Sequence, residues 1–380
     1  MTALTAEEAQ ALVLRHGSVD EAARNSPMSV GAFRRFCREN GIAAIQRLAS
    51  SADGVTSEAM LRQEVTELRR QVARLSKTAV RDERILEVVR ETTTALKPRY
   101  APRPKRKASK QTAQEGVLLW GDVHAAESIT LDETGGLNAY SWDEMLARHD
   151  RILESLFSFR DHQTFPISHL HIAGLGDFLS GEIHDLAETN EKPMVEATLQ
   201  FGVDAARWIE RMVPEFESIT LTGVSGNHPR TSLKPKTKNV AVTNFDWLAL
   251  EIIAMQLAKY PSVHVTVPKS PYTTMDVLGT RFFLFHGDGV SSSALVRRVR
   301  ELEKTFASLS PIHVWLCGHF HVAQMLEQGK IFVNGSVVGP NGFSLKTFGG
   351  GAPAQQTLLL VHPTRRITEV LPLDLQRGGS

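Results

Sequence analysis

The chain has 380 residues, enough for two or three folded units, and its 43 Lys and Arg nearly balance its 42 Asp and Glu, for a formal net charge of +1. Its two cysteines, Cys37 and Cys317, have no partner nearby in sequence, which excludes a disulfide framework and fits a reducing compartment. No apolar run reaches about 18 residues and none lies near Met1, so we expect neither a membrane span nor a signal peptide. These exclusions predict a cytoplasmic protein.

The charges are unevenly distributed along the chain. Residues 1–110 hold 21 Lys and Arg against 13 Asp and Glu, whereas residues 111–380 hold 22 against 29. A basic arm joined to an acidic body suggests that the arm binds a polyanion.

Residues 1–50 predict a small domain of three helices, at 6–16, 19–25 and 29–40, that resembles a helix-turn-helix. Gly17 is expected to end the first helix, while Ser18 and Ser29 are expected to cap the second and third. In the third helix we expect Val30, Phe33 and Cys37 to face inward and three arginines to face outward, namely Arg34, Arg35 and Arg38.

That third helix is of the kind that enters the major groove of DNA, with its arginines on bases or phosphates. The alternative is a protein-binding module whose basic face is merely solvated.

Residues 51–97 predict a long helix, because apolar residues alternate at spacings of four and three, the seam of a coiled coil: Leu61, Val65, Leu68, Val72 and Leu75. This segment would pair two chains into a homodimer or fold back on its own domain. Residues 98–114 predict a basic, proline-containing linker that touches phosphates or serves only as a solubilising spacer.

Residues 115–375 predict the main folded domain. Short apolar runs, typical of buried strands, occupy residues 117–120, 170–175, 219–224, 282–285 and 312–317, and two further strands are expected at 358–361 and 367–371. Apolar residues recur at helical spacing in residues 142–159, 194–212, 246–260 and 292–309. Three histidines inside expected strands are interpreted as structural: His169, His171 and His313.

Each of the first five strands ends in a glycine and polar residues. The five strings are GDVH from Gly121, GD at Gly176, GNH from Gly226, HGD from His286 and GHFH from Gly318. Polar residues at several strand ends can converge on one crevice. The strings supply two aspartates, an asparagine and four histidines that could hold metal, with one further histidine, a set that suits a site for two metal ions that cleaves a phosphoester.

The order of these strings resembles that of the calcineurin-like metallophosphoesterase superfamily, and within it the SbcD-like exonucleases and bacteriophage-encoded phosphoesterases. The resemblance implies an α/β fold, a four-layer sandwich of two mixed β-sheets flanked by helices. It implies that one metal is held by Asp122, His124 and His321, the other by Asn227, His286 and His319, and that Asp177 bridges both. His228 would stand beside the metals as the catalytic acid. If the chain is phage-encoded, its location would be the host bacterial cytoplasm.

Ligands of mixed carboxylate, imidazole and amide type suit two divalent ions, with Mn²⁺ favoured and Fe²⁺, Zn²⁺, Co²⁺ or Mg²⁺ as alternatives. His184 and Asp185, just after the Asp177 string, are candidates for a supporting role around the ligands, with an ordinary loop position as the alternative.

The sequence departs from the pattern of the protein phosphatases in that superfamily. The string after Gly176 reads Asp177-Phe178-Leu179-Ser180-Gly181, without the arginine that grips phosphate, and Pro229 instead of an acidic residue follows His228. Protein phosphatase activity is therefore not expected.

A basic loop at residues 228–244 begins at the expected catalytic histidine. Its cations could contact the phosphates that flank a scissile bond, and the alternative is a solvated loop. They are Arg230, Lys234, Lys236 and Lys238.

Together these features predict a metal-dependent phosphodiesterase, a DNA nuclease targeted by its N-terminal arm. Two alternatives remain: a phosphodiesterase for small nucleotides, and a DNA-binding structural component whose site has lapsed.

Overall fold

The computed structural model describes residues 4–40, 42, 99–100, 113–183, 190–234, 238–308, 311–348 and 350–376. The chain divides into two units, residues 1–85 and 86–380, and each is described by itself. The coiled coil expected at residues 51–97 lies outside the described residues, as does nearly all of the expected linker. The described helices include none with the length and apolar run needed to cross a membrane.

The N-terminal unit contains three short helices, α1 (Ala6–His16), α2 (Val19–Arg24) and α3 (Val30–Glu39). Side-chain oxygens of Thr5, Ser18 and Ser29 accept from backbone N–H groups at the three helix starts, and Gly17, at φ 77°, ends α1. The predicted helix ends are confirmed to within one residue. A small apolar core joins the helices; it includes Ala9, Val13, Ala22, Ala23, Phe33 and Cys37.

One orientation predicted for α3 is wrong. Phe33 and Cys37 are buried as expected, but Val30 is 38% exposed, because it is the first residue of the helix and lies beyond the small core that the other two residues enter. The arginines face outward. The Arg34 Nε donates to Asp20 Oδ1 at 2.8 Å, whereas Arg35 and Arg38 are exposed.

The second unit is built on two mixed β-sheets. The six-stranded sheet has the order β11-β10-β1-β2-β3-β4. Strands β1 to β4 run parallel to one another, and β10 runs antiparallel to both of its neighbours, β1 and β11. Its strands are β1 (Gln114–Trp120), β2 (Ile167–Gly174), β3 (Ser218–Gly223), β4 (Val263–Thr266), β10 (Gln355–His362) and β11 (Arg366–Asp374).

The five-stranded sheet has the order β5-β6-β7-β9-β8, with β6, β7 and β9 parallel and an antiparallel strand at each edge. Its strands are β5 (Tyr272–Val277), β6 (Thr280–Phe285), β7 (Val314–Cys317), β8 (Gln324–Leu326) and β9 (Ile331–Val333).

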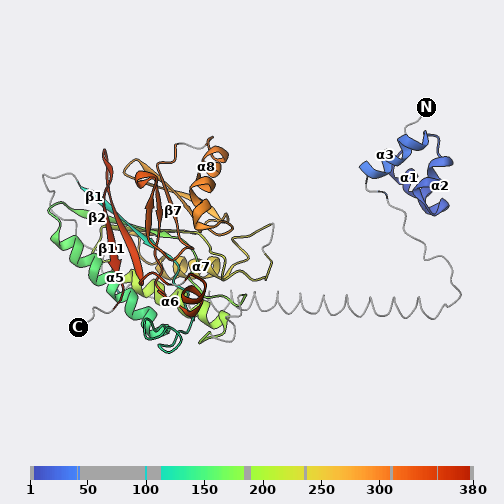
Figure 1. Ribbon diagram of the computed structural model, residues 1–380. Coiled ribbons are helices and arrows are strands. Elements are labelled where there is room, and N and C mark those ends of the chain that lie inside the picture. The colour runs from blue at the N-terminus through green and yellow to red at the C-terminus, as the bar shows by residue number, and fades with distance from the viewer. Residues whose placement is uncertain are drawn as a thin grey trace. The chain divides into compact units, whose positions relative to one another are not determined.

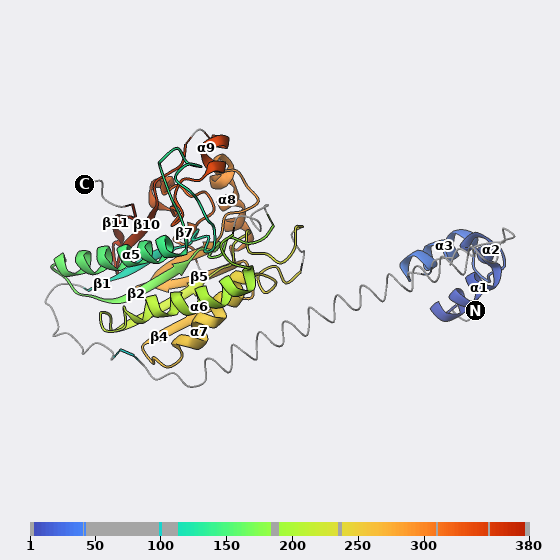
Figure 2. The ribbon, with the colours of Figure 1, turned by 90° about the horizontal axis from the view of Figure 1, so that it is seen from below.

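Four layers result from the burial of both faces of each sheet. Helices α5 (Trp142–His162), α6 (Met194–Glu210) and α7 (Phe245–Leu257) cover the outer face of the six-stranded sheet, and α8 (Leu295–Thr305) covers that of the five-stranded sheet (Figures 1 and 2). Between the sheets, apolar side chains of β1 and β2 pack against those of β6, β7 and β9. The four-layer arrangement predicted from the resemblance is thus present.

Most strands and helices of this unit lie where the sequence predicts them. The elements not predicted are β4, β5, β8, β9, the short 3-10 helix η3 (Glu327–Gly329) and the short helix α9 (Gly342–Phe348). The expected helix 292–309 is a short 3-10 helix, η2 (Ser292–Ala294), followed by α8. The histidines predicted to be structural pair within the sheets: His169 contacts Ser218, His171 contacts Glu115 and Thr220, and His313 accepts from the Arg281 backbone.

Candidate metal centre

The ends of five strands meet at one edge of the two sheets. Strands β1, β2 and β3 are neighbours and parallel, so the residues that follow them emerge side by side. Strands β6 and β7 are likewise neighbours in the other sheet. The seven side chains predicted to hold metal are all brought to this edge, together with His228.

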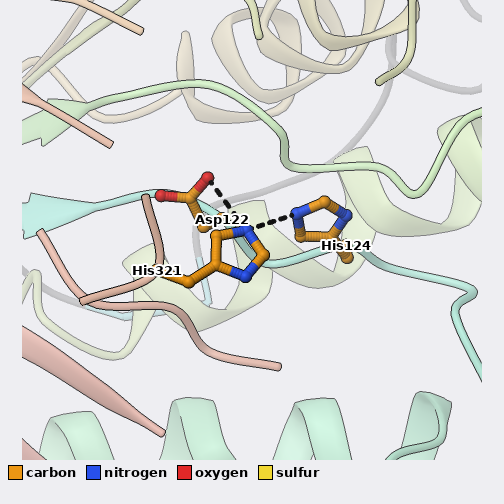
Figure 3. Close-up of side chains that lie close together, drawn as sticks. All are labelled: Asp122, His124 and His321. Atoms are coloured by element: carbon orange, nitrogen blue, oxygen red, sulfur yellow. Dashed lines mark hydrogen bonds and ion pairs between the residues drawn. The ribbon is translucent and has the colours of Figure 1, made fainter. Parts of the chain in front are cut away.

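Three of these residues form a first ligand group, Asp122, His124 and His321, whose ligand atoms lie within 4.8 Å of one another (Figure 3). The two Nε2 atoms of His124 and His321 are 3.1 Å apart, and His321 Nε2 is 3.6 Å from Asp122 Oδ1. Burial lowers the pKa of both imidazoles, that of His124 well below its ordinary value. Both rings are therefore neutral at pH 7 and offer lone pairs, the form in which histidine binds metal.

A second ligand group consists of Asp177, His286 and His319. The Nδ1 of His286 donates to the Leu175 carbonyl at 2.7 Å, which leaves Nε2 to face the site. That Nε2 is 2.9 Å from Asp177 Oδ2 and 3.0 Å from Asn227 Oδ1. The Nε2 atom of His286 thus faces two acceptor oxygens. Such contacts are favourable when Nε2 carries a proton or when a cation lies between the nitrogen and the oxygens.

The electrostatics of His286 reflect this convergence. Burial would lower its pKa, but the Asp177 carboxylate outweighs burial and raises the pKa to about 10. Conversely, although burial opposes it, the charge of His286 lowers the pKa of Asp177 well below its ordinary value. Without metal, protonated His286 therefore supplies the positive charge that offsets the Asp177 carboxylate.

Asp177 links the two groups. It belongs to the second group and also to a further one with His124 and His228, and its buried Oδ2 lies 2.9 Å from His286 Nε2. Its Oδ1 accepts from the His228 backbone N–H at 2.8 Å. A buried carboxylate that belongs to both sets of imidazoles fits a residue that would contact both ions.

His228 lies against the first group, with its ring centroid 4.6 Å from that of His124. Its Nδ1 is 3.3 Å from the Ser180 carbonyl oxygen. The backbone carbonyl is thus placed to orient the ring.

Five of the seven predicted ligands adopt left-handed backbone conformations: Asp122, His124, Asp177, His319 and His321 have φ between 48° and 72°. Non-glycine residues rarely adopt this region, and such residues cluster at functional sites where surrounding contacts impose them. Here the Asp177 carbonyl accepts from the N–H groups of Val123 and His124. The two strand-end loops therefore hold each other in this conformation.

Two glycines in the strings allow the carboxylates of Asp177 and Asp122 to lie directly against the backbone. A Cβ on Gly226 would lie 2.1 Å from Asp177 Oδ1, and one on Gly318 would lie 2.5 Å from Asp122 Oδ2. The carboxylate of Asp122 accepts from the His319 backbone N–H at that second position.

Sequence reasoning missed a residue that supports both loops, Asp246 at the start of α7. Its fully buried carboxylate accepts from the N–H groups of Phe178 at 3.0 Å, Leu179 at 3.2 Å and Gly226 at 2.9 Å. Burial, with Asp177 adding to it, raises the pKa of Asp246 to about 7. The available signal was an aspartate at the start of a strongly apolar helix, where no solvated face exists to receive it.

Glu127 was missed as well. Its Oε2 lies 3.7 Å from His124 Nδ1, and its Oε1 accepts from Asn341 at 3.0 Å. Burial raises the pKa of Glu127 to about 7. It is placed to orient the His124 ring.

The structure describes the basic loop at residues 228–244 except for residues 235–237. Lys236 lies outside the described residues, as do His184 and Asp185, whereas Lys234 and Lys238 are exposed. The Arg230 guanidinium donates to the carbonyls of Asn227, Ser232 and Leu233, so it braces its own loop. Contact of these cations with a substrate remains a prediction.

Replacing Asp246 with asparagine should weaken the site without removing a ligand. The amide would present a donor to one of the three backbone N–H groups, which costs about 1–3 kcal/mol, and metal affinity should fall roughly 10- to 100-fold. Calorimetric titration with Mn²⁺ and thermal melting measure both effects. Asp276→Asn, in an exposed pair with Arg281, is the matched control and should change neither; equal behaviour of the two variants would contradict the role of Asp246.

Metal binding should release protons. The pKa of His286 is about 10 against an ordinary 6.5, so an entering ion must displace its proton throughout the neutral range. Apparent affinity should rise about tenfold per pH unit from pH 7 to 9. Calorimetry in two buffers of different ionisation enthalpy counts the protons, and a count of zero at pH 8 would refute the assignment.

No protein-family model and no curated protein matches the chain significantly. Solved structures that resemble it include vacuolar protein sorting 29 from Cryptosporidium parvum, with 14% identity over 69% of this chain and 98% of that one and a TM-score of 0.28. A predicted phosphoesterase from Streptococcus pneumoniae TIGR4 has 11% identity over 69% and 99%, with a TM-score of 0.27. A novel archaeal phosphodiesterase has 10% identity over 68% and 98%, with a TM-score of 0.30. Because these values are low, the side chains of the site, not the likenesses, support the function proposed next.

Proposed function

We propose that this chain is a metal-dependent phosphodiesterase that holds two divalent cations. The observation that carries the proposal is the position of Asp177, a buried carboxylate shared between the two groups of imidazoles. Asp122, His124 and His321 would hold one ion; Asn227, His286 and His319 would hold the other. The retention of all seven side chains argues against a lapsed site.

The chemistry divides between the ions and the chain. When bound, two such cations offset the charge of a phosphate and lower the pKa of a water to about 7. The chain contributes a fixed carboxylate and three imidazoles that are neutral before an ion binds, those of His124, His319 and His321, so these ligands need little rearrangement. His228, beside His124 and oriented by the Ser180 carbonyl, would donate a proton to the departing alkoxide.

Loss of the shared carboxylate should abolish activity. With Mn²⁺ present, the purified chain should hydrolyse bis(p-nitrophenyl) phosphate, and EDTA should stop it. Asp177→Asn should lower metal content and reduce the rate roughly a hundredfold or more. Asp276→Asn serves again as the surface control. Full activity of Asp177→Asn, or of the EDTA-treated protein, would rule out the proposal.

Within the same experiment, His228→Ala separates a proton donor from a ligand. As a donor, His228 can be lost without loss of metal. The variant should cleave an ester with an alkyl leaving group roughly 10²- to 10⁴-fold more slowly, and a p-nitrophenyl ester, which needs no proton, much less so. A fall in metal content would instead make His228 a ligand.

We further propose that the substrate is a polynucleotide, and that the protein acts as a DNA nuclease with Mn²⁺ as the favoured ion. The basic loop that begins at His228 supports this proposal, since two of its lysines, Lys234 and Lys238, are exposed. The exposed Arg35 and Arg38 of α3 support a role of the N-terminal unit in binding DNA.

Arg35→Ala combined with Arg38→Ala should weaken DNA binding if α3 contacts the phosphates. The slope of log affinity against log salt should become shallower by about two, because each arginine neutralises one phosphate. Fluorescence anisotropy of the full chain with duplex DNA measures this slope. The pair Arg15→Ala and Arg24→Ala removes equal charge from α1 and α2. An equal decrease in affinity for both pairs would exclude α3 as the DNA-binding helix.

A further inference from the structure

A cavity of about 310 Å³ adjoins the second ligand group. It is lined by His286 of that group and by Asn227, whose Oδ1 lies 3.0 Å from His286 Nε2, so its inner end is the site itself. Its other walls come from the basic loop, the start of β5, the end of β6 and α8, and include Arg230, Val240, Ala241, Tyr272, Phe285 and Arg298. Its volume lies at the lower end of the range for small-molecule sites.

One wall of the cavity is rigid and aromatic. Tyr272 stands directly opposite Phe285 in the β5–β6 register, one residue before the ligand His286. Its ring lies 5.8 Å from the rings of Phe283 and Phe306, and its hydroxyl accepts from Arg298 Nη2 at 3.0 Å. Contacts with the core therefore fix the ring and the guanidinium beside it before any ligand enters.

The remaining walls mix apolar and polar groups. Val240, Ala241 and Pro271 add apolar surface, while Ser225 and Thr243 add hydrogen-bonding groups. The cavity does not present a dedicated phosphate clamp, because Arg230 is engaged by three carbonyls of its own loop and Asp288 places a carboxylate on the lining. Such a lining suits an uncharged organic group with a flat face and polar edges.

We propose that this cavity binds the nucleoside esterified to the scissile phosphate. The inference rests on the proposed function, which places that phosphate at the ligand groups. A substituent one ester bond away then enters the adjoining cavity. Bases stack on aromatic rings and on guanidinium planes, the two surfaces that Tyr272 and Arg298 offer together. The nucleoside belongs either to a small phosphodiester or to the end of a polynucleotide.

The test compares two esters that release the same p-nitrophenol. Methyl p-nitrophenyl phosphate carries only a methyl group at the position where thymidine 5′-(p-nitrophenyl phosphate) carries the nucleoside. Val240→Trp fills the cavity from its rim without touching a predicted ligand. It should raise KM for the nucleoside ester roughly tenfold or more, the effect of losing one stacked base, and leave the simple ester within about twofold. Tyr272→Ala should act in the same direction.

Val370→Trp on β11 is the matched control, because Val370 and Val240 are both 43% exposed and only Val240 lines the cavity. Val370→Trp should leave the KM for both esters unchanged. Equal losses on both esters with Val240→Trp, or no loss on the nucleoside ester, would overturn the inference. Hydrolysis of a single-stranded oligonucleotide shows which substrate supplies the nucleoside. If Val240→Trp slows cleavage of the oligonucleotide and of the nucleoside ester alike, the nucleoside belongs to a polynucleotide end. If it slows cleavage of the nucleoside ester alone, the nucleoside belongs to a small nucleotide.

Failure of the proposed function looks different. The wild-type chain would then hydrolyse neither ester with any divalent metal. Calorimetric binding of thymidine 5′-monophosphate still decides the question in that case. Binding that Val240→Trp abolishes and Val370→Trp preserves supports the cavity as a nucleoside site, and absent binding contradicts it.

Discussion

The arrangement of the site depends on one buried carboxylate. Asp246 accepts backbone N–H groups from the loop after β2 and from the loop after β3, and so fixes the distance between them. Asp177 and Asn227 stand on those loops, and their spacing follows from the same three hydrogen bonds. An ionised carboxylate suits this task because both of its oxygens accept, so all three N–H groups find an acceptor.

The left-handed ligands show what such bracing achieves. Each of these backbone conformations is unfavourable alone, and several occur within a few residues of one another. They are maintained because the loops exchange backbone hydrogen bonds and because Gly226 and Gly318 let carboxylates lie against the chain. The side chains are therefore directed before an ion arrives, and little of the binding free energy is spent on ordering them.

Sequence patterns predicted the parts of this protein that depend on local chemistry. Apolar runs located β1, β2, β3, β6 and β7, and the strings that follow them contain the seven predicted ligands and His228, which the structure brings together. The patterns missed β8 and β9, which have three residues each, too few to show a period. They missed Asp246 and Glu127 because an isolated acidic residue carries no motif, and its role exists only through partners distant in sequence. Val30 was misplaced because periodicity gives a direction around a helix axis but not the extent of the neighbouring core.

The ligands come from both sheets, and this has a consequence for the interior of the domain. Asp122 and Asp177 follow strands of the six-stranded sheet, whereas His286 and His319 follow strands of the five-stranded one. The apolar layer between the sheets, where Leu119 and Leu284 lie, sets their relative height together with the hydrogen bonds that His319 and His286 make to the loops of the other sheet. Any substitution there that lets one sheet slide on the other would pull the two halves of the coordination shell out of alignment. The proposed affinity for ions would thus depend on the interior packing as much as on the side chains at the site.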